Sequence, residues 1–321
     1  MAPARRIVTI VSLGVVMLSA GFCRDARAGN DYFYKPSRKA VSTVIADVQW
    51  RDEVRGRDVP VRIHVPVDAS EYPLCPVVVF SPDKEGSDGS LDDVVRYLSA
   101  RGYICAVVRH PDMPADPNEC RPLRSADLSF ALDNLLARDQ EHPLLRGRID
   151  RTNVGVAGCG CGAGAVLDMA GQVAAVEGGK WLSLRDMRVR AAVAVAPPPA
   201  DVAAAAGWSW DRVRIPVLTV GGEPPRGSEG QPEGWGCTPF MNLPNGHKYH
   251  LSLRGAECGE ELPSRPGRWW RTIGGERHEL TLQTMIAFLD DHLCDIPRAE
   301  NWLESDSPEK ATDSNGRFLR K

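Results

Sequence analysis

Two thiols flank a glycine in the sequence Gly158-Cys-Gly-Cys-Gly162, where an apolar run (154–157) meets a run of small residues. An apolar strand that turns sharply into a helix is a setting in which hydrolases present a nucleophilic side chain. Glycines at both ends suit such a turn, because its close backbone contacts leave no room for a Cβ atom. The apex is Gly160, which has no side-chain atom to attack a carbonyl. The sequence therefore predicts a catalytic type of turn without its catalyst.

The neighbouring cysteines leave other chemistry open. Cys161 would lie at the start of the following helix, where the helix N-terminus lowers a thiol pKa and favours the thiolate nucleophile. Cys159, Cys161 and Cys258 could also form a disulfide, or a metal site with His247 or His250. These spacings are permissive but weak as zinc signatures, so we predict no metal.

The pattern Gly158-x-Gly160-x-x-Ala163 also fits the glycine fingerprint of dinucleotide-binding folds. That fingerprint requires an acidic residue further along, and the strand expected at 191–195 is followed by Ala-Pro-Pro-Pro instead. We therefore predict no cofactor. The N-terminus of the helix after the turn could still hold an anion.

The turn must be positioned by alternating strands and helices. Continuous apolar runs at 75–80 and 104–108 are typical of strands buried on both faces of a parallel sheet. Apolar residues at helical spacing separate them, which indicates an α/β fold with a mostly parallel sheet covered by helices on both faces. We expect two strands within 41–66, further strands at 75–80, 104–108, 153–157, 191–195, 217–220 and 249–253, and helices near 91–98, 128–136, 162–170 and 282–293.

Residues 1–28 have the pattern of a secretory signal peptide. Arg5 and Arg6 precede an apolar run (7–22), and Ala-Arg-Ala before Gly29 matches a cleavage site. We expect a protein exported to the periplasm or the extracellular space, with no transmembrane segment in the mature chain. Eight cysteines remain after cleavage, so disulfides are possible, but their connectivity is open.

The mature chain is long enough for one large domain, which we place at 29–303. Residues 304–321 are charged and poor in apolar side chains, so a disordered tail is expected there. The net charge of −3 comes without a basic stripe, which argues against a nucleic-acid partner. The partner that remains is an unknown small molecule or protein.

Several segments together resemble the secreted bacterial α/β-hydrolases often described as predicted dienelactone hydrolases or platelet-activating-factor acetylhydrolase-like esterases. The similarity spans roughly residues 57–303 and implies an α/β-hydrolase fold with about eight strands. It is carried by the segments 76–81 (PVVVFS), 101–111 (RGYICAVVRHP), 124–133 (RSADLSFALD), 144–150 (LLRGRID) and 248–257 (KYHLSLRGAE).

The resemblance implies a serine, an acid and a histidine at three positions that here hold Gly160, Pro225 and Cys258. A thiol at the histidine position cannot take up a proton near neutral pH as imidazole does. Glu223 lies two residues early and would need a shifted loop to replace the acid. Dienelactone hydrolases use cysteine at the centre of the turn, but the cysteines here lie beside the centre.

The resemblance also implies an oxyanion loop of the form Ser-His-Gly, where this chain has Pro82, Asp83 and Lys84 after Ser81. Proline removes a backbone N–H donor, and a carboxylate opposes the negative charge that such a loop stabilises. We therefore expect an inactive member of the family that acts by binding a ligand or a partner.

The alternative is an ester hydrolase that uses the thiol of Cys161 or Cys159, and a scaffold without ligand is a third possibility. If a ligand binds, we expect Trp235 and the segment 268–270 to line its site. We expect structural roles for His110 and His278.

Overall fold

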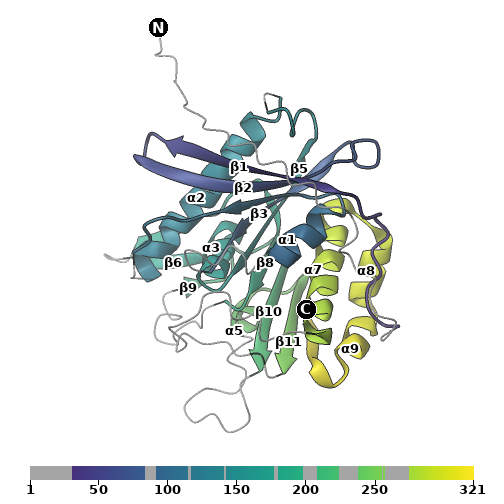
Figure 1. The fold of residues 1–321 in the computed structure, drawn as a ribbon. Helices are drawn as coiled ribbons and strands as arrows, with labels where there is room; N and C mark the ends of the chain where they lie inside the picture. Colours follow the sequence, from purple (N-terminus) through teal and green to yellow (C-terminus); the bar gives the residue numbers. More distant parts are fainter. Residues whose placement is uncertain are drawn as a thin grey trace.

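The computed structural model describes residues 31–83, 92–114, 117–140, 142–176, 180–197, 208–223, 238–254, 256 and 275–321. Within them, a nine-stranded sheet forms the centre of the molecule, in the order β1-β2-β4-β3-β5-β8-β10-β11-β12 (Figure 1). Its strands are β1 (Thr43–Asp52), β2 (Arg57–Pro66), β3 (Cys75–Ser81), β4 (Ile104–Val108), β5 (Ile149–Cys159), β8 (Val189–Val195), β10 (Val217–Glu223), β11 (Lys248–Arg254) and β12 (Gly316–Arg320).

The sheet is mixed, so the prediction of a mostly parallel sheet of about eight strands was wrong in that respect. Strands β4, β3, β5, β8, β10 and β11 are parallel to their neighbours in the centre. β1 and β2 form an antiparallel hairpin, β2 is antiparallel to β4, and β12 is antiparallel to β11. A short turn between consecutive strands permits only antiparallel pairing, which is why the hairpin cannot continue the parallel centre.

Helices cover both faces of this sheet. On one face, α2 (Pro117–Ala137) and α3 (Cys161–Ala170) pack against the strands through one apolar core. On the other face, α1 (Asp92–Ser99), α7 (Glu276–Cys294) and α8 (Pro297–Glu304) share a second core. Within the described residues, no helix is long and apolar enough to span a membrane.

Smaller elements complete the described part. A separate three-stranded sheet consists of β6 (Val173–Val176), β7 (Lys180–Ser183) and β9 (Trp208–Ser209), and α5 (Thr238–Asn242) precedes β11.

The C-terminal residues are ordered, so the expectation of a disordered tail at 304–321 was wrong. Helix α9 (Ser307–Thr312) and the one-turn η4 (Asp313–Asn315) lead into β12, which pairs with β11. Two apolar side chains of this segment, Ala311 and Phe318, are buried, and Phe318 stacks on Tyr249. Backbone pairing with the edge of β11 supplies the order that composition alone did not suggest.

The connections reverse direction between β3 and β5. From β3 the chain passes to β4 on one side, returns past β3 to β5, and then continues to β8, β10 and β11 on the other side. Open α/β sheets bind ligands outside the carboxyl ends of the strands at such a switch point. Here β3 and β5 end side by side, with Ser81 in register with Gly158.

Candidate functional site at the Gly160 turn

The turn between β5 and α3 consists of Gly160, with φ 54° and ψ −122°. This left-handed backbone favours glycine, and such strain is typical of turns that present a catalytic group. A Cβ atom at Gly158 would lie 2.5 Å from the Gly162 carbonyl oxygen. A Cβ atom at Gly162 would overlap with the Ser81 carbonyl. The turn is therefore packed closely against the end of β3.

The carboxylate of Asp83 occupies the apex of this turn. Its Oδ1 accepts a hydrogen bond of 2.9 Å from the backbone N–H of Cys161. A Cβ atom at Gly160 would clash with this carboxylate, so the carboxylate stands where a nucleophilic side chain would be. The N–H after the apex is also the one that hydrolases direct at the oxyanion. The helix N-terminus, which the sequence suggested could hold an anion, is occupied by the chain's own Asp83.

The thiol of Cys161 is held in its neutral form, so the prediction of a lowered pKa was wrong. Burial and the negative charge of Asp83 raise its pKa to about 11. The helix N-terminus cannot favour the thiolate here, because the carboxylate already takes its first N–H and adds a like charge. Cys159 is buried in the core beneath the turn. The Cys161 thiol is not in a disulfide.

The histidines considered as metal partners do not converge on these thiols. His247 directly precedes β11, at the amino edge of the parallel strands, whereas Gly160 follows β5 at their carboxyl edge. The His250 ring lies 2.8 Å from the Thr219 hydroxyl and stacks on Phe240. No cluster of three or more metal-ligating side chains occurs in the part of the chain that the structure describes.

The strands that precede the acid and histidine positions are neighbours in the sheet. Pro225, Cys258, Lys84, Trp235 and residues 268–270 fall outside the described residues. β10 and β11, which lead to the first two, run side by side, with Gly222 in register with Leu253. A Cβ atom at Gly222 would overlap with the Ala256 carbonyl, so these strand ends approach closely.

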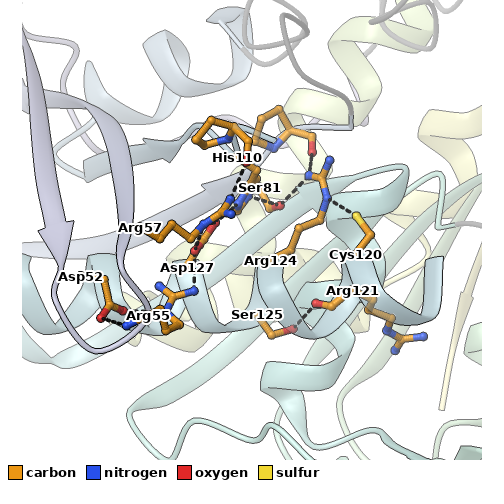
Figure 2. A network of polar contacts seen from close by, with 12 residues as sticks. Asp52, Arg55, Arg57, Ser81, His110, Cys120, Arg121, Arg124, Ser125 and Asp127 are labelled. Carbon is orange, nitrogen blue, oxygen red and sulfur yellow. Dashed lines mark hydrogen bonds and ion pairs between the residues drawn. The ribbon is translucent and has the colours of Figure 1, made fainter. Parts of the chain in front are cut away.

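A buried serine–histidine–carboxylate network, Ser81–His110–Asp127, begins at the end of β3, and sequence analysis did not identify it (Figure 2). The Ser81 hydroxyl lies 2.9 Å from Nε2 of His110, whose Nδ1 lies 3.0 Å from Asp127 Oδ2. Ser81 ends β3, His110 follows β4, and Asp127 is on α2. Since β3 and β4 are parallel neighbours, polar residues directly after both strands were the signal that could have revealed the pair.

The charges around the Ser81–His110–Asp127 network determine where its protons lie. Burial opposes ionisation of Asp127, but hydrogen bonds from His110 and Arg55 and the charge of Arg57 outweigh it and lower the pKa. Burial lowers the pKa of His110 to about 4, against the hydrogen bond to Asp127, so the ring is neutral at neutral pH. Nδ1–H therefore donates to Asp127, and Nε2 accepts from the Ser81 hydroxyl.

The Ser81–His110–Asp127 network supports the loop that carries Asp83 and is not exposed to a substrate. Ser81, His110 and Asp127 are 0–3% exposed. Arg124 lies beside Ser81 and donates to the carbonyl oxygens of Pro82 at 2.7 Å and Asp83 at 2.6 Å. Figure 2 shows Arg124 beside Ser81, and its two bonds to carbonyl oxygens hold the backbone that carries Asp83. The structural role expected for His110 agrees with this arrangement.

Comparison with models of protein families gives no match, and comparison with curated proteins gives no significant match.

Proposed function

We propose that this chain is an exported relative of the α/β-hydrolases that does not hydrolyse esters and acts by binding a ligand or a partner. The observation that carries the proposal is the hydrogen bond between Asp83 and the Cys161 N–H at Gly160. The Asp83 carboxylate fills the place of the nucleophile, and its hydrogen bond occupies an N–H donor that acyl transfer requires. Relationship to the hydrolase family is supported by the strand–turn–helix at the switch point and by the sequence segments that resemble that family.

The position of the Asp83 carboxylate also argues against an ester hydrolase that uses a cysteine thiol. A nucleophilic cysteine must be a thiolate near neutral pH, and a pKa of about 11 leaves Cys161 almost entirely protonated. His110, which follows β4, is already bonded to Ser81 and Asp127. Cys159 is buried under the turn and is not presented to a substrate.

The proposal is tested by assaying the purified protein and Cys161→Ala against short-chain nitrophenyl esters. We expect no turnover above buffer in either protein, because neither a nucleophile nor a free oxyanion donor is available. Cys294→Ala is the matched control: burial also raises the pKa of Cys294 to about 11, and that residue lies on α7. Turnover that survives in Cys294→Ala and is lost in Cys161→Ala would establish the thiol hydrolase instead.

Export is part of the same proposal and rests on the pattern of residues 1–28. Expression in a bacterial host should yield periplasmic or secreted protein whose first residue is Gly29. A chain that stays in the cytoplasm with residues 1–28 attached would refute this part without affecting the proposed loss of hydrolysis.

A further inference from the structure

Two thiols, those of Cys120 and Cys161, lie beside one group of contacts at the end of β3. The Cys120 sulfur accepts a hydrogen bond of 3.2 Å from Nε of Arg124 (Figure 2). The same guanidinium donates to the Asp83 carbonyl oxygen at 2.6 Å. The Asp83 carboxylate in turn accepts the backbone N–H of Cys161 at 2.9 Å. Three short contacts therefore connect the Cys120 sulfur to the backbone of Cys161.

The packing of α2 against α3 brings these two residues to the same level. Both helices connect parallel strands, so they run in the same direction. The Ser125 hydroxyl of α2 lies 3.4 Å from the Ala165 carbonyl oxygen of α3. One turn of about four residues back along each helix leads to Arg121 on α2 and to Cys161 on α3. Cys120 is the sequence neighbour of Arg121, so the two cysteines face each other across the helix pair.

The surroundings of the two thiols differ in their access to solvent. Cys161 is partly exposed, whereas Cys120 is 8% exposed. Burial and the Asp83 carboxylate raise the pKa of Cys161, and the Cys120 thiol adds to this rise, which is an effect of close neighbours. Both residues are in the thiol form in this structure. A reagent from solvent therefore reaches Cys161 first and Cys120 second.

We propose that Cys120 and Cys161 are a redox pair that a disulfide oxidant converts to a disulfide between α2 and α3. The Cys161 thiolate attacks one sulfur of the oxidant and forms a mixed disulfide, and the released thiolate takes up the proton that Cys161 lost. The Cys120 thiolate then attacks the Cys161 sulfur, and the second thiolate of the oxidant leaves with the proton of Cys120. Two electrons pass from the protein to the oxidant, which is reduced to two thiols.

The new bond would tie the first turn of α2 to the first residue of α3, beside the loop that carries Asp83. Helix ends fray more readily than helix interiors, which gives the two sulfur atoms freedom to approach for bond formation. Oxidation would then fix both helix ends at the Gly160 turn, and reduction would release them. The inference goes beyond the proposed binding function and does not depend on it.

The test treats the full chain with oxidised glutathione, blocks the remaining thiols with iodoacetamide and maps the non-reduced tryptic peptides by mass spectrometry. We expect residues 110–124, which contain Cys120, to be linked to residues 152–180, which contain Cys161, in most of the protein. The second peptide also contains Cys159. Cys159→Ala is therefore the matched control and should keep the link, whereas Cys161→Ala should lose it.

The order of the two steps gives a second measurement. In Cys120→Ala, Cys161 should keep the glutathione, because the thiol that displaces it is gone. The rate of this addition should rise about tenfold per pH unit below the Cys161 pKa of about 11, since only the thiolate attacks.

Three results would overturn the inference. They are retention of glutathione on Cys161 in the unchanged protein, a link from Cys161 to another cysteine such as Cys258, and alkylation of both Cys120 and Cys161 after oxidation. Each of them leaves the proposed loss of hydrolysis intact. Ester turnover that depends on Cys161 would instead refute the proposed function and leave the disulfide unaffected.

Discussion

The Gly160 turn and the buried Ser81–His110–Asp127 network each have the features of a catalytic site that the other lacks. The turn has the strained backbone that presents a nucleophile, but it has no nucleophile and a carboxylate fills its place. The buried chain has a hydroxyl, an imidazole and a carboxylate in the order that activates a serine, but its members are 0–3% exposed. Both regions meet at the end of β3.

The difference between the two regions shows that the order of hydrogen bonds is not sufficient for catalysis. A serine–histidine–aspartate arrangement acts as a catalyst only where the hydroxyl meets a substrate and an oxyanion donor is free. Here the hydroxyl faces the core, and the donor is bonded to Asp83. The same three groups instead stabilise a loop, so their effects should appear in stability measurements.

The largest expected effect comes from removing the charge at the end of the buried chain. Asp127→Asn leaves the guanidinium groups of Arg55 and Arg57 without their shared carboxylate, which should lower the free energy of unfolding by about 3–5 kcal/mol. Denaturant unfolding measures this loss. Asp47→Asn is the control, because its half-exposed pair with Arg62 should contribute less than about 1 kcal/mol. Equal losses in both variants would contradict the structural role of the buried chain.

Acid should weaken the same region. The pKa of His110 is about 4 in the folded protein and 6.5 in its ordinary state, so the unfolded chain binds the extra proton between these values. Stability should therefore fall as the pH falls from about 6.5 to about 4, with a His110 contribution of roughly 3 kcal/mol.

His110→Gln removes that titration, so its unfolding free energy should depend less steeply on pH across this window. His64, His250 and His292 also have lowered pKa values and retain part of the dependence. Identical slopes in the variant and the unchanged protein would show that His110 does not carry the effect.

A smaller effect is expected at the turn itself. Gly160→Ser places a Cβ atom against the Asp83 carboxylate on a left-handed backbone, which should cost about 2–3 kcal/mol and give no esterase activity. Gly147→Ser is the control, since Gly147 also has a positive φ but has open space around it. Asp83→Gly should relieve part of the loss when combined with Gly160→Ser. A fully additive pair would contradict the proposed steric exclusion.

Local patterns predicted most of the parallel centre. The strand expected at 104–108 is β4 with the same bounds, and the glycine turn lies between a strand and a helix as its spacing indicated. Apolar periodicity also predicted the β1–β2 hairpin and the helices α2 and α3. It predicted β10 and β11 as well, the strands that lead to positions 225 and 258. β12 was missed because its order depends on pairing with β11, which a charged composition does not reveal.

The candidate site was predictable in part. The resemblance to hydrolase motifs led us to expect Gly160 at the apex of the turn and Asp83 in the adjoining loop, since both expectations depend on local motifs. The contact between Asp83 and Cys161 joins residues 78 positions apart. The pKa of the Cys161 thiol, which was expected to be lowered, is therefore raised. The chain from Ser81 to Asp127 joins the ends of two strands to a helix, so it required the strand order as well as the residues.

The mutual exclusion of Asp83 and a side chain at position 160 has an evolutionary consequence. A mutation that restores a nucleophile meets the carboxylate, and a mutation that removes the carboxylate leaves the apex empty. If the chain descends from an esterase, as proposed above, neither single substitution would restore activity, and selection would have to retain an intermediate without benefit. Under the proposed relationship to esterases, the pair would hinder the return of hydrolysis by successive substitutions.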